Sequence, residues 1–125
     1  MKKIIETKKA PNPIGPYSQA VLSGNTLYTS GQIAVDPQSG KLILENIKSE
    51  TVQVMKNLQS ILEEADMGFE HVIKTSIFIS NMKDFNKINS VYEKYFQTKF
   101  PARETIQVAR LPKEVNVEIS MIAQK

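Results

Sequence analysis

The stretch that decides the fold is residues 46–80, NIKSETVQVMKNLQSILEEADMGFEHVIKTSIFIS. From about Asn46 to Asp66, apolar residues recur at three- and four-residue spacing, which predicts a long amphipathic helix. Gly68 suits the C-terminal stop of that helix. Residues 71–80 are dense in β-branched side chains and predict a central strand. The apolar helix positions are Ile47, Val54, Met55, Leu58, Ile61, Leu62 and Ala65.

A second helix is predicted directly after this strand. Asn81 can cap it, and Asp84 at the third helical position interacts favourably with the helix dipole. Pro101 is expected to end it. Its aromatic and aliphatic stripe is predicted to belong to the core, and consists of Phe85, Ile88, Val91, Tyr92, Tyr95 and Phe96.

The segments on either side of the helices indicate strands. Residues 3–7 (KIIET) predict a short strand, and the proline-rich residues 10–19 an ordered loop or a rigid extended path. Residues 19–30 predict a hairpin that turns at Gly24-Asn25. Residues 31–44 predict another strand with a turn at 36–40. Two closing strands are expected at 104–111 and 115–123.

The resulting order is roughly β-β-β-α-β-α-β-β, which predicts one α+β domain over residues 1–125 with two helices on one sheet face. In the last strand, alternation places Asn116, Glu118 and Ser120 on the face away from the helices, together with Ile122. That mixture of polar and apolar residues favours an oligomer with a ligand site at the seam between chains. The opposite side of this strand carries Val115, Val117, Ile119, Met121 and Ala123.

Composition excludes several kinds of chemistry. The chain has 125 residues, 41% of them hydrophobic and 23% charged, which is typical of globular proteins. It has no cysteine, so thiol nucleophiles and zinc-thiolate sites are excluded. Its single histidine, His71, excludes a multi-histidine metal site, and no phosphate loop or dinucleotide fingerprint is present. The net charge of +3 is mild and the lysines are scattered, which argues against nucleic-acid binding. No membrane span or signal sequence is recognised, and the cytoplasm is the expected location.

Both arginines of the chain, Arg103 and Arg110, lie in FPARETIQVARLP (100–112), whereas the other fourteen basic residues are lysines. A planar guanidinium binds a carboxylate or phosphate through two parallel hydrogen bonds, which a lysine cannot do. The position therefore indicates an anionic ligand for one arginine. For Arg110, a structural or inter-subunit ion pair is the better prediction.

Five segments in order, IGPYSQ (14–19), TSGQI (29–33), FPAR (100–103), VARLP (108–112) and VEI (117–119), together resemble the RidA/YjgF family of reactive-intermediate deaminases. The resemblance spans nearly the whole chain. It implies a chorismate-mutase-like mixed sheet and a barrel-like homotrimer with active sites between subunits. It also implies hydrolysis of 2-aminoacrylate, 2-iminopropanoate or 2-iminobutanoate to a 2-keto acid and ammonia, without a cofactor or metal.

The same resemblance assigns roles to particular residues. Arg103 would bind the carboxylate of a 2-imino acid, and Glu118 would position a water molecule and exchange its proton. The substrate pocket would be lined by Tyr17, Ser30, Gly31, Asn89 and Thr105. Many relatives carry a cysteine at the position of Thr105, so a thiol role is excluded in this chain, while a backbone contact there remains open.

Purely structural roles for several of these residues are also compatible with the sequence. Glu118 could be a buried structural carboxylate, Tyr17 a packing residue, and Asn89 a solvated helix position. Two other functions also remain: an RNA-directed role, as a ribonuclease or translation inhibitor, and a non-catalytic trimer that binds small acids. The mild charge and the lack of paired histidines argue against the first, and Arg103 argues against the second.

Overall fold

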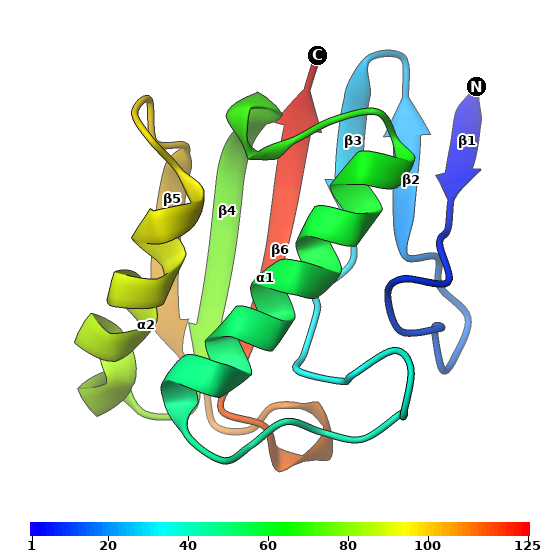
Figure 1. Cartoon of the computed structure of the whole chain (residues 1–125). Coiled ribbons are helices and arrows are strands. Elements are labelled where there is room, and N and C mark those ends of the chain that lie inside the picture. Colours follow the sequence, from blue (N-terminus) through cyan, green and yellow to red (C-terminus); the bar gives the residue numbers. More distant parts are fainter.

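A six-stranded mixed sheet with the order β1-β2-β3-β6-β4-β5 forms the frame of the protein, as described over residues 1–125 by a computed structural model (Figure 1). All neighbouring strands are antiparallel except β4 and β5. A parallel pair needs a crossover connection, which helix α2 supplies. The strands are β1 (Lys2–Ile5), β2 (Ala20–Ser23), β3 (Thr26–Thr29), β4 (Val72–Ile79), β5 (Ala102–Gln107) and β6 (Val117–Gln124).

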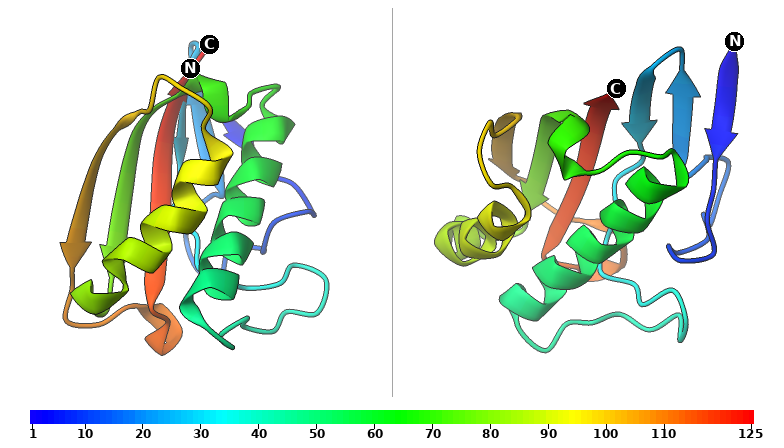
Figure 2. Two further views of the ribbon diagram at one scale, coloured as in Figure 1. Left: turned by 60° about the vertical axis from the view of Figure 1, so that its left-hand side comes forward. Right: turned by 45° about the horizontal axis from the view of Figure 1, so that its top comes forward.

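Both helices, α1 (Ile47–Glu64) and α2 (Phe85–Tyr92), lie on the same face of this sheet (Figure 2). The predicted α+β class and element order are thereby confirmed. Every second residue of β6 faces the helices, and none of these four is more than 2% exposed. Full burial of each large aliphatic side chain stabilises the fold by roughly 1.5–3 kcal/mol. These β6 residues are Val117, Ile119, Met121 and Ala123, and they pack in one core with Leu58, Ile61 and Leu62 of α1.

Helix α1 begins where the sequence predicts, because the Asn46 side chain accepts a hydrogen bond from the Ser49 backbone N–H at 2.8 Å. Its end differs from the prediction. Asp66, with φ of 57°, adopts the left-handed conformation that reverses the chain, whereas Gly68 is extended. Aspartate tolerates this conformation through its short polar side chain, so glycine is not needed for the stop.

Helix α2 is shorter than the periodicity suggests. Asn81 caps a 3₁₀ turn at Met82–Asp84, which leads into the helix, and a second 3₁₀ turn at Glu93–Tyr95 follows it. The chain has therefore left the helix before it reaches Pro101. The predicted aromatic stripe does pack together, since the rings of Tyr92 and Phe96 lie 4.8 Å apart.

Two predicted strands need correction. Residues 31–44 form no strand, only single bridges of Gln32 to Ile119 and of Val35 to Leu42. The side-chain amide of Asn57 on α1 donates to two carbonyls of this segment and holds it to the helix instead of a neighbouring strand. The predicted strand at 104–111 is shifted, because pairing with β4 begins at Ala102 and ends at Gln107.

The sheet face away from the helices is largely uncovered in the single chain. Tyr28 and Ile106 are each about half exposed there, and Lys74 and Glu104 form an ion pair of 3.0 Å on the same face. This face has the mixed character that the alternation of β6 predicts. Neither helix is long and apolar enough to cross a membrane.

Candidate functional site

Glu118 lies on β6 and points to the uncovered face, opposite Phe78 of β4. Its carboxyl is about half buried, and this burial raises its pKa above the ordinary value of 4.5. Burial penalises the charged form because the surroundings solvate it poorly. A half-buried carboxyl with a raised pKa is a candidate for proton transfer.

Gly31 explains how the Glu118 carboxylate reaches this position. A Cβ built on Gly31 would overlap the carboxylate and would lie 2.8 Å from its Cδ atom. The backbone at 31–33 is held against β6 by two hydrogen bonds between Gln32 and Ile119, one of 2.8 Å and one of 3.1 Å. Glycine thus allows the close approach of chain and carboxylate. The structure brings Gly31 and Glu118 together, as the predicted site requires.

Ser30 joins this region to the proline-rich loop at 10–19. Its hydroxyl donates to the carbonyl of Ser18 at 2.6 Å, and its N–H donates to the carbonyl of Gln19. Ser30 is therefore bound to backbone within the chain. Tyr17 in the same loop is about half exposed, and it lines a hollow of about 440 Å³ together with Gly31.

Sequence reasoning missed Gln19, the buried residue that shapes this loop. Its side-chain oxygen accepts from the Thr7 N–H at 2.7 Å, and its amide lies within hydrogen-bonding distance of the carbonyls of Thr7, Ala10 and Pro11. One buried amide thus satisfies backbone groups of the irregular chain, which would otherwise be unpaired. The signal was the glutamine at the end of IGPYSQ, a polar residue beside a predicted strand.

Arg103 lies on β5, on the helix side of the sheet, and belongs to a second group of residues. Its guanidinium donates to the Asn89 side-chain oxygen at 2.7 Å and lies 5.1 Å from the centre of the Tyr92 ring and 5.7 Å from that of Phe85. Tyr92 is itself fixed by a hydrogen bond to Thr75. The guanidinium therefore has a defined orientation through aromatic contact and one hydrogen bond. Arg103 and Asn89 also line a hollow of about 280 Å³.

Thr105 lies two residues further along β5, on the same side as Arg103. Its hydroxyl oxygen is buried and has no hydrogen-bond partner in the chain. Buried hydroxyls nearly always have a partner, so the lack of one for Thr105 is unusual. The structure thus places Arg103, Asn89 and Thr105 in one region.

The two groups do not meet within one chain. Arg103 pairs with Thr75, which pairs with Met121, three residues from Glu118 and on the opposite face of the sheet. Two strand spacings and three residues along the strand separate the Cα atoms of Arg103 and Glu118 by about 14 Å. We call Glu118, Gly31, Ser30 and Tyr17 the carboxylate half-site, and Arg103, Asn89 and Thr105 the arginine half-site.

Arg110 is in neither half-site. It lies beyond the end of β5, so it does not share a strand with Arg103, and its exposed guanidinium pairs with Glu114. The ion pair predicted for Arg110 is present within one chain. Such an exposed pair contributes at most about 1 kcal/mol to stability.

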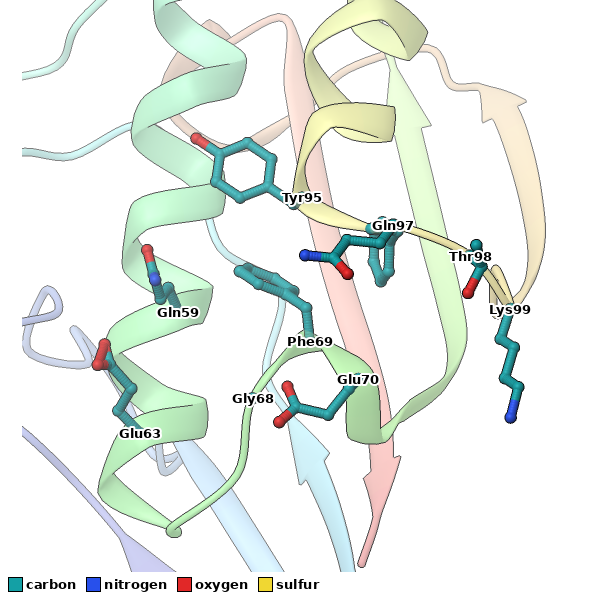
Figure 3. Close-up of a pocket in the computed structure, with 10 residues that line it drawn as sticks. Gln59, Glu63, Gly68, Phe69, Glu70, Tyr95, Gln97, Thr98 and Lys99 are labelled. Atoms are coloured by element: carbon teal, nitrogen blue, oxygen red, sulfur yellow. The ribbon is translucent and has the colours of Figure 1, made fainter.

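A further hollow of about 650 Å³ lies between the C-terminal half of α1 and the loop that follows α2 (Figure 3). Phe69 and Tyr95 point into it, with Glu63 and Glu70 at its side (Figure 3). It contains none of the predicted site residues. Nearby His71 accepts a hydrogen bond from the Gly68 N–H on its Nδ1, which is a local structural role. No three His, Asp or Glu side chains are grouped so that they could hold a metal ion.

Comparison with known proteins identifies the family. The family model described as "Endoribonuclease L-PSP" matches residues 7–125. The chain belongs to this family, the Rid family. A "RutC family protein" of Saccharolobus solfataricus is 48% identical over 125 residues, covering 100% of this chain and 99% of that protein. The human "2-iminobutanoate/2-iminopropanoate deaminase" is 46% identical, covering 98% and 90%.

The fold comparison agrees with the sequence comparison. The crystal structure of Escherichia coli TdcF with bound serine superposes with a TM-score of 0.95 at 41% identity, covering 98% of both chains. The resemblance to the Rid family that the five sequence segments indicated is confirmed.

The contact between Gly31 and Glu118 makes a stability prediction. Gly31 does not have a positive φ, so alanine fits its backbone and only the overlap with the carboxylate opposes it. We expect Gly31→Ala to lower the free energy of unfolding by about 1–3 kcal/mol. In a Glu118→Ala background the same change should have almost no effect, since the space is vacated.

Urea unfolding of the four proteins at one protein concentration measures this coupling. Equal losses in both backgrounds would show that Gly31 is required for a reason other than the carboxylate.

Proposed function

We propose that this protein hydrolyses small 2-imino acids to 2-keto acids and ammonia. The observation that carries the proposal is the half-buried Glu118 carboxyl, held against Gly31, which lines an open hollow, in a chain that also presents an oriented arginine. The name of the human relative supports this reaction. The serine bound in the TdcF structure supports a small amino-acid-like ligand.

Arg103 is proposed to bind the substrate carboxylate. The aromatic rings of Tyr92 and Phe85 and the oxygen of Asn89 fix the guanidinium plane, which leaves other N–H groups free for an anion. A bidentate pair with the carboxylate would fix the adjacent C=N carbon. Thr105 lies on the same side of β5, two residues from Arg103, so its backbone can contribute a further contact to the substrate.

Glu118 is proposed to activate water. In its ionised form it takes a proton from a water molecule as the oxygen attacks the imine carbon, and the C=N bond becomes C–N. That proton then passes to the nitrogen, which becomes an amine. Glu118 next takes the proton of the new hydroxyl and passes it to the same nitrogen, so the C–N bond breaks and ammonia leaves as the C=O bond forms. The atoms balance as one imino acid and one water yielding one keto acid and one ammonia. The raised pKa of Glu118 suits a group that must both accept and return a proton.

The active site is proposed to form between subunits of a homotrimer. The half-sites lie on opposite faces of one sheet, so a single chain cannot place both on one small substrate. The uncovered sheet face, with Tyr28 and Ile106 half exposed, offers the surface against which a second chain would pack. Each site would then take the arginine half-site from one chain and the carboxylate half-site from its neighbour.

RNA cleavage is the second candidate, because the matching family model carries an endoribonuclease description. The chain offers one histidine, whose Nδ1 is already bonded, and scattered lysines. Release of nucleotides from RNA, abolished by Glu118→Gln, would favour this candidate over imine hydrolysis.

The variant Arg103→Lys tests whether Arg103 binds the substrate carboxylate. It keeps the positive charge but loses the planar fork, so we expect kcat/KM for imine decay to fall by about 100-fold, the equivalent of roughly 3 kcal/mol. The imine is generated in situ by an amino-acid oxidase, and the surviving imine is trapped with semicarbazide. Arg110→Lys is the matched control and should retain full activity, since Arg110 lies in neither half-site. If the wild type left imine decay at the buffer rate, the proposed hydrolysis would be refuted. Equal activity of the two variants would refute the proposed binding of the substrate carboxylate by Arg103.

The pH dependence of the reaction tests Glu118. The proposed base must be ionised in order to accept a proton, and burial has raised its pKa. We therefore expect kcat/KM to fall as the pH drops through a midpoint above the ordinary value of 4.5, and to level off above it. Glu118→Gln should remove most of the activity, and the remaining kcat/KM should no longer fall at low pH. If the Glu118→Gln variant lost activity at low pH with the same midpoint, the pH dependence would belong to another titrating group.

Mixing two inactive variants tests the shared site. Arg103→Ala and Glu118→Gln are unfolded together at a 1:1 ratio and refolded. If each site takes Arg103 from one chain and Glu118 from its neighbour, random assembly of the two variants into trimers leaves both residues intact in about a quarter of the sites. We expect about a quarter of wild-type activity from the mixture and none beyond background from either variant refolded alone. No recovery in a mixture shown by sedimentation to be trimeric would place both residues of each site in one chain.

A further inference from the structure

A buried glutamate outside both half-sites holds the start of β6. Glu50, in the first turn of α1, is fully buried. One of its carboxylate oxygens accepts the backbone N–H of Asn116 at 2.7 Å, and the other accepts the Asn116 side-chain amide at 2.8 Å. A buried carboxylate is retained only where donors compensate its lost hydration.

Asn116 is bound on its other side by the end of β4. Its backbone carbonyl accepts the N–H of Ser80 at 3.0 Å, and its side-chain oxygen accepts the Ser80 hydroxyl at 3.2 Å. All four polar groups of Asn116 are therefore occupied by Glu50 and Ser80. We call these three residues the clamp.

The clamp lies close in sequence to Glu118 of the carboxylate half-site. Asn116 directly precedes β6 and lies two residues before Glu118, so the clamp holds the backbone at the point where the strand that carries Glu118 begins. The turn that precedes Asn116 is strained, because Lys113 and Glu114 both have φ near +57° without being glycine. A strained connection does not by itself fix where the next strand begins, and the clamp supplies that constraint.

We propose that Glu50, acting through Asn116 and Ser80, is a positioning residue that fixes the Glu118 carboxylate against Gly31. A carboxylate is required at position 50 because it presents two acceptors to two donors, whereas glutamine would turn an N–H₂ group toward one of them. Asparagine is required at position 116 because its side chain donates to Glu50 and accepts from Ser80. The inference rests on the proposed function for its catalytic consequence, but its structural part is independent.

The variant Glu50→Gln tests the clamp with almost no change in shape. We expect kcat for imine hydrolysis to fall about ten-fold with little change in KM, because the arginine half-site is untouched. We also expect the NMR titration midpoint of the Glu118 carboxyl carbon to move toward that of a solvated carboxyl. That carboxyl owes its raised pKa to burial, and the charged pair on the same face, Lys74–Glu104, lies on β4 and β5.

A double variant that exchanges the carboxylate and the amide between positions 50 and 116 should restore the clamp. In Glu50→Gln/Asn116→Asp the new glutamine can donate to the aspartate while its oxygen accepts the backbone N–H at 116. This double variant should recover both kcat and the Glu118 midpoint in large part. Ser80→Ala removes the 3.2 Å bond from the opposite side and should produce a smaller change in the same direction, which tests the clamp even if Glu50→Gln folds poorly.

Asn46→Ala is the matched control for lost stability. It removes the cap of the same helix end without touching the clamp, so it should lower Tm and leave kcat and the Glu118 midpoint unchanged. If Glu50→Gln behaves like Asn46→Ala, the clamp is structural only and the proposal is overturned. If the wild type has no imine activity, the proposed function fails, while the NMR titration still decides whether the clamp positions Glu118.

Discussion

The alternation of side chains along β6 is the constraint on which the rest of the structure depends. Val117 and Ile119 must face the helices to complete the core, and a strand with a period of two then forces Glu118 onto the opposite face. A slip of one residue would bury the carboxylate under α1 and expose the aliphatic side chains. The placement of the proposed catalytic group is thus secured by the hydrophobic core, and the clamp at Asn116 sets where the alternation starts.

A consequence of this geometry is that one chain carries the two half-sites apart from each other. β5 pairs with β4 in a register that turns Arg103 toward the aromatic rings of α2, away from the face of Glu118. No rotamer of either residue brings them across the sheet, since core side chains fill the space between the helices and the strands. The proposed catalysis by both residues on one substrate therefore requires assembly, and the stability of that assembly would be a condition for the proposed activity.

Sequence patterns were sufficient for the fold class, the element order and the faces of β6, because these follow from the hydrophobic period. They failed where single side-chain contacts override the pattern. Residues 31–44 look strand-like, but Asn57 of α1 binds their carbonyls, and no periodicity reveals a contact 24 residues away. Gly68 was the wrong stop because Asp66 can adopt the same backbone conformation. The grouping of the site residues into two half-sites depends on the register of β4 and β5, which a sequence does not encode locally.

The use of arginine at only two positions in a lysine-rich chain now has a physical account. At position 103 the cation lies near the faces of two aromatic rings and against an amide oxygen, where a flat, weakly hydrated guanidinium can pack and still present free donors. A lysine ammonium there would lose hydration without gaining a planar fork. At position 110 one nitrogen of the guanidinium pairs with Glu114 across a strained turn, on the exposed side of the connection that leads to Asn116. One arginine thus faces a proposed ligand, while the other stabilises the connection to the strand that carries Glu118.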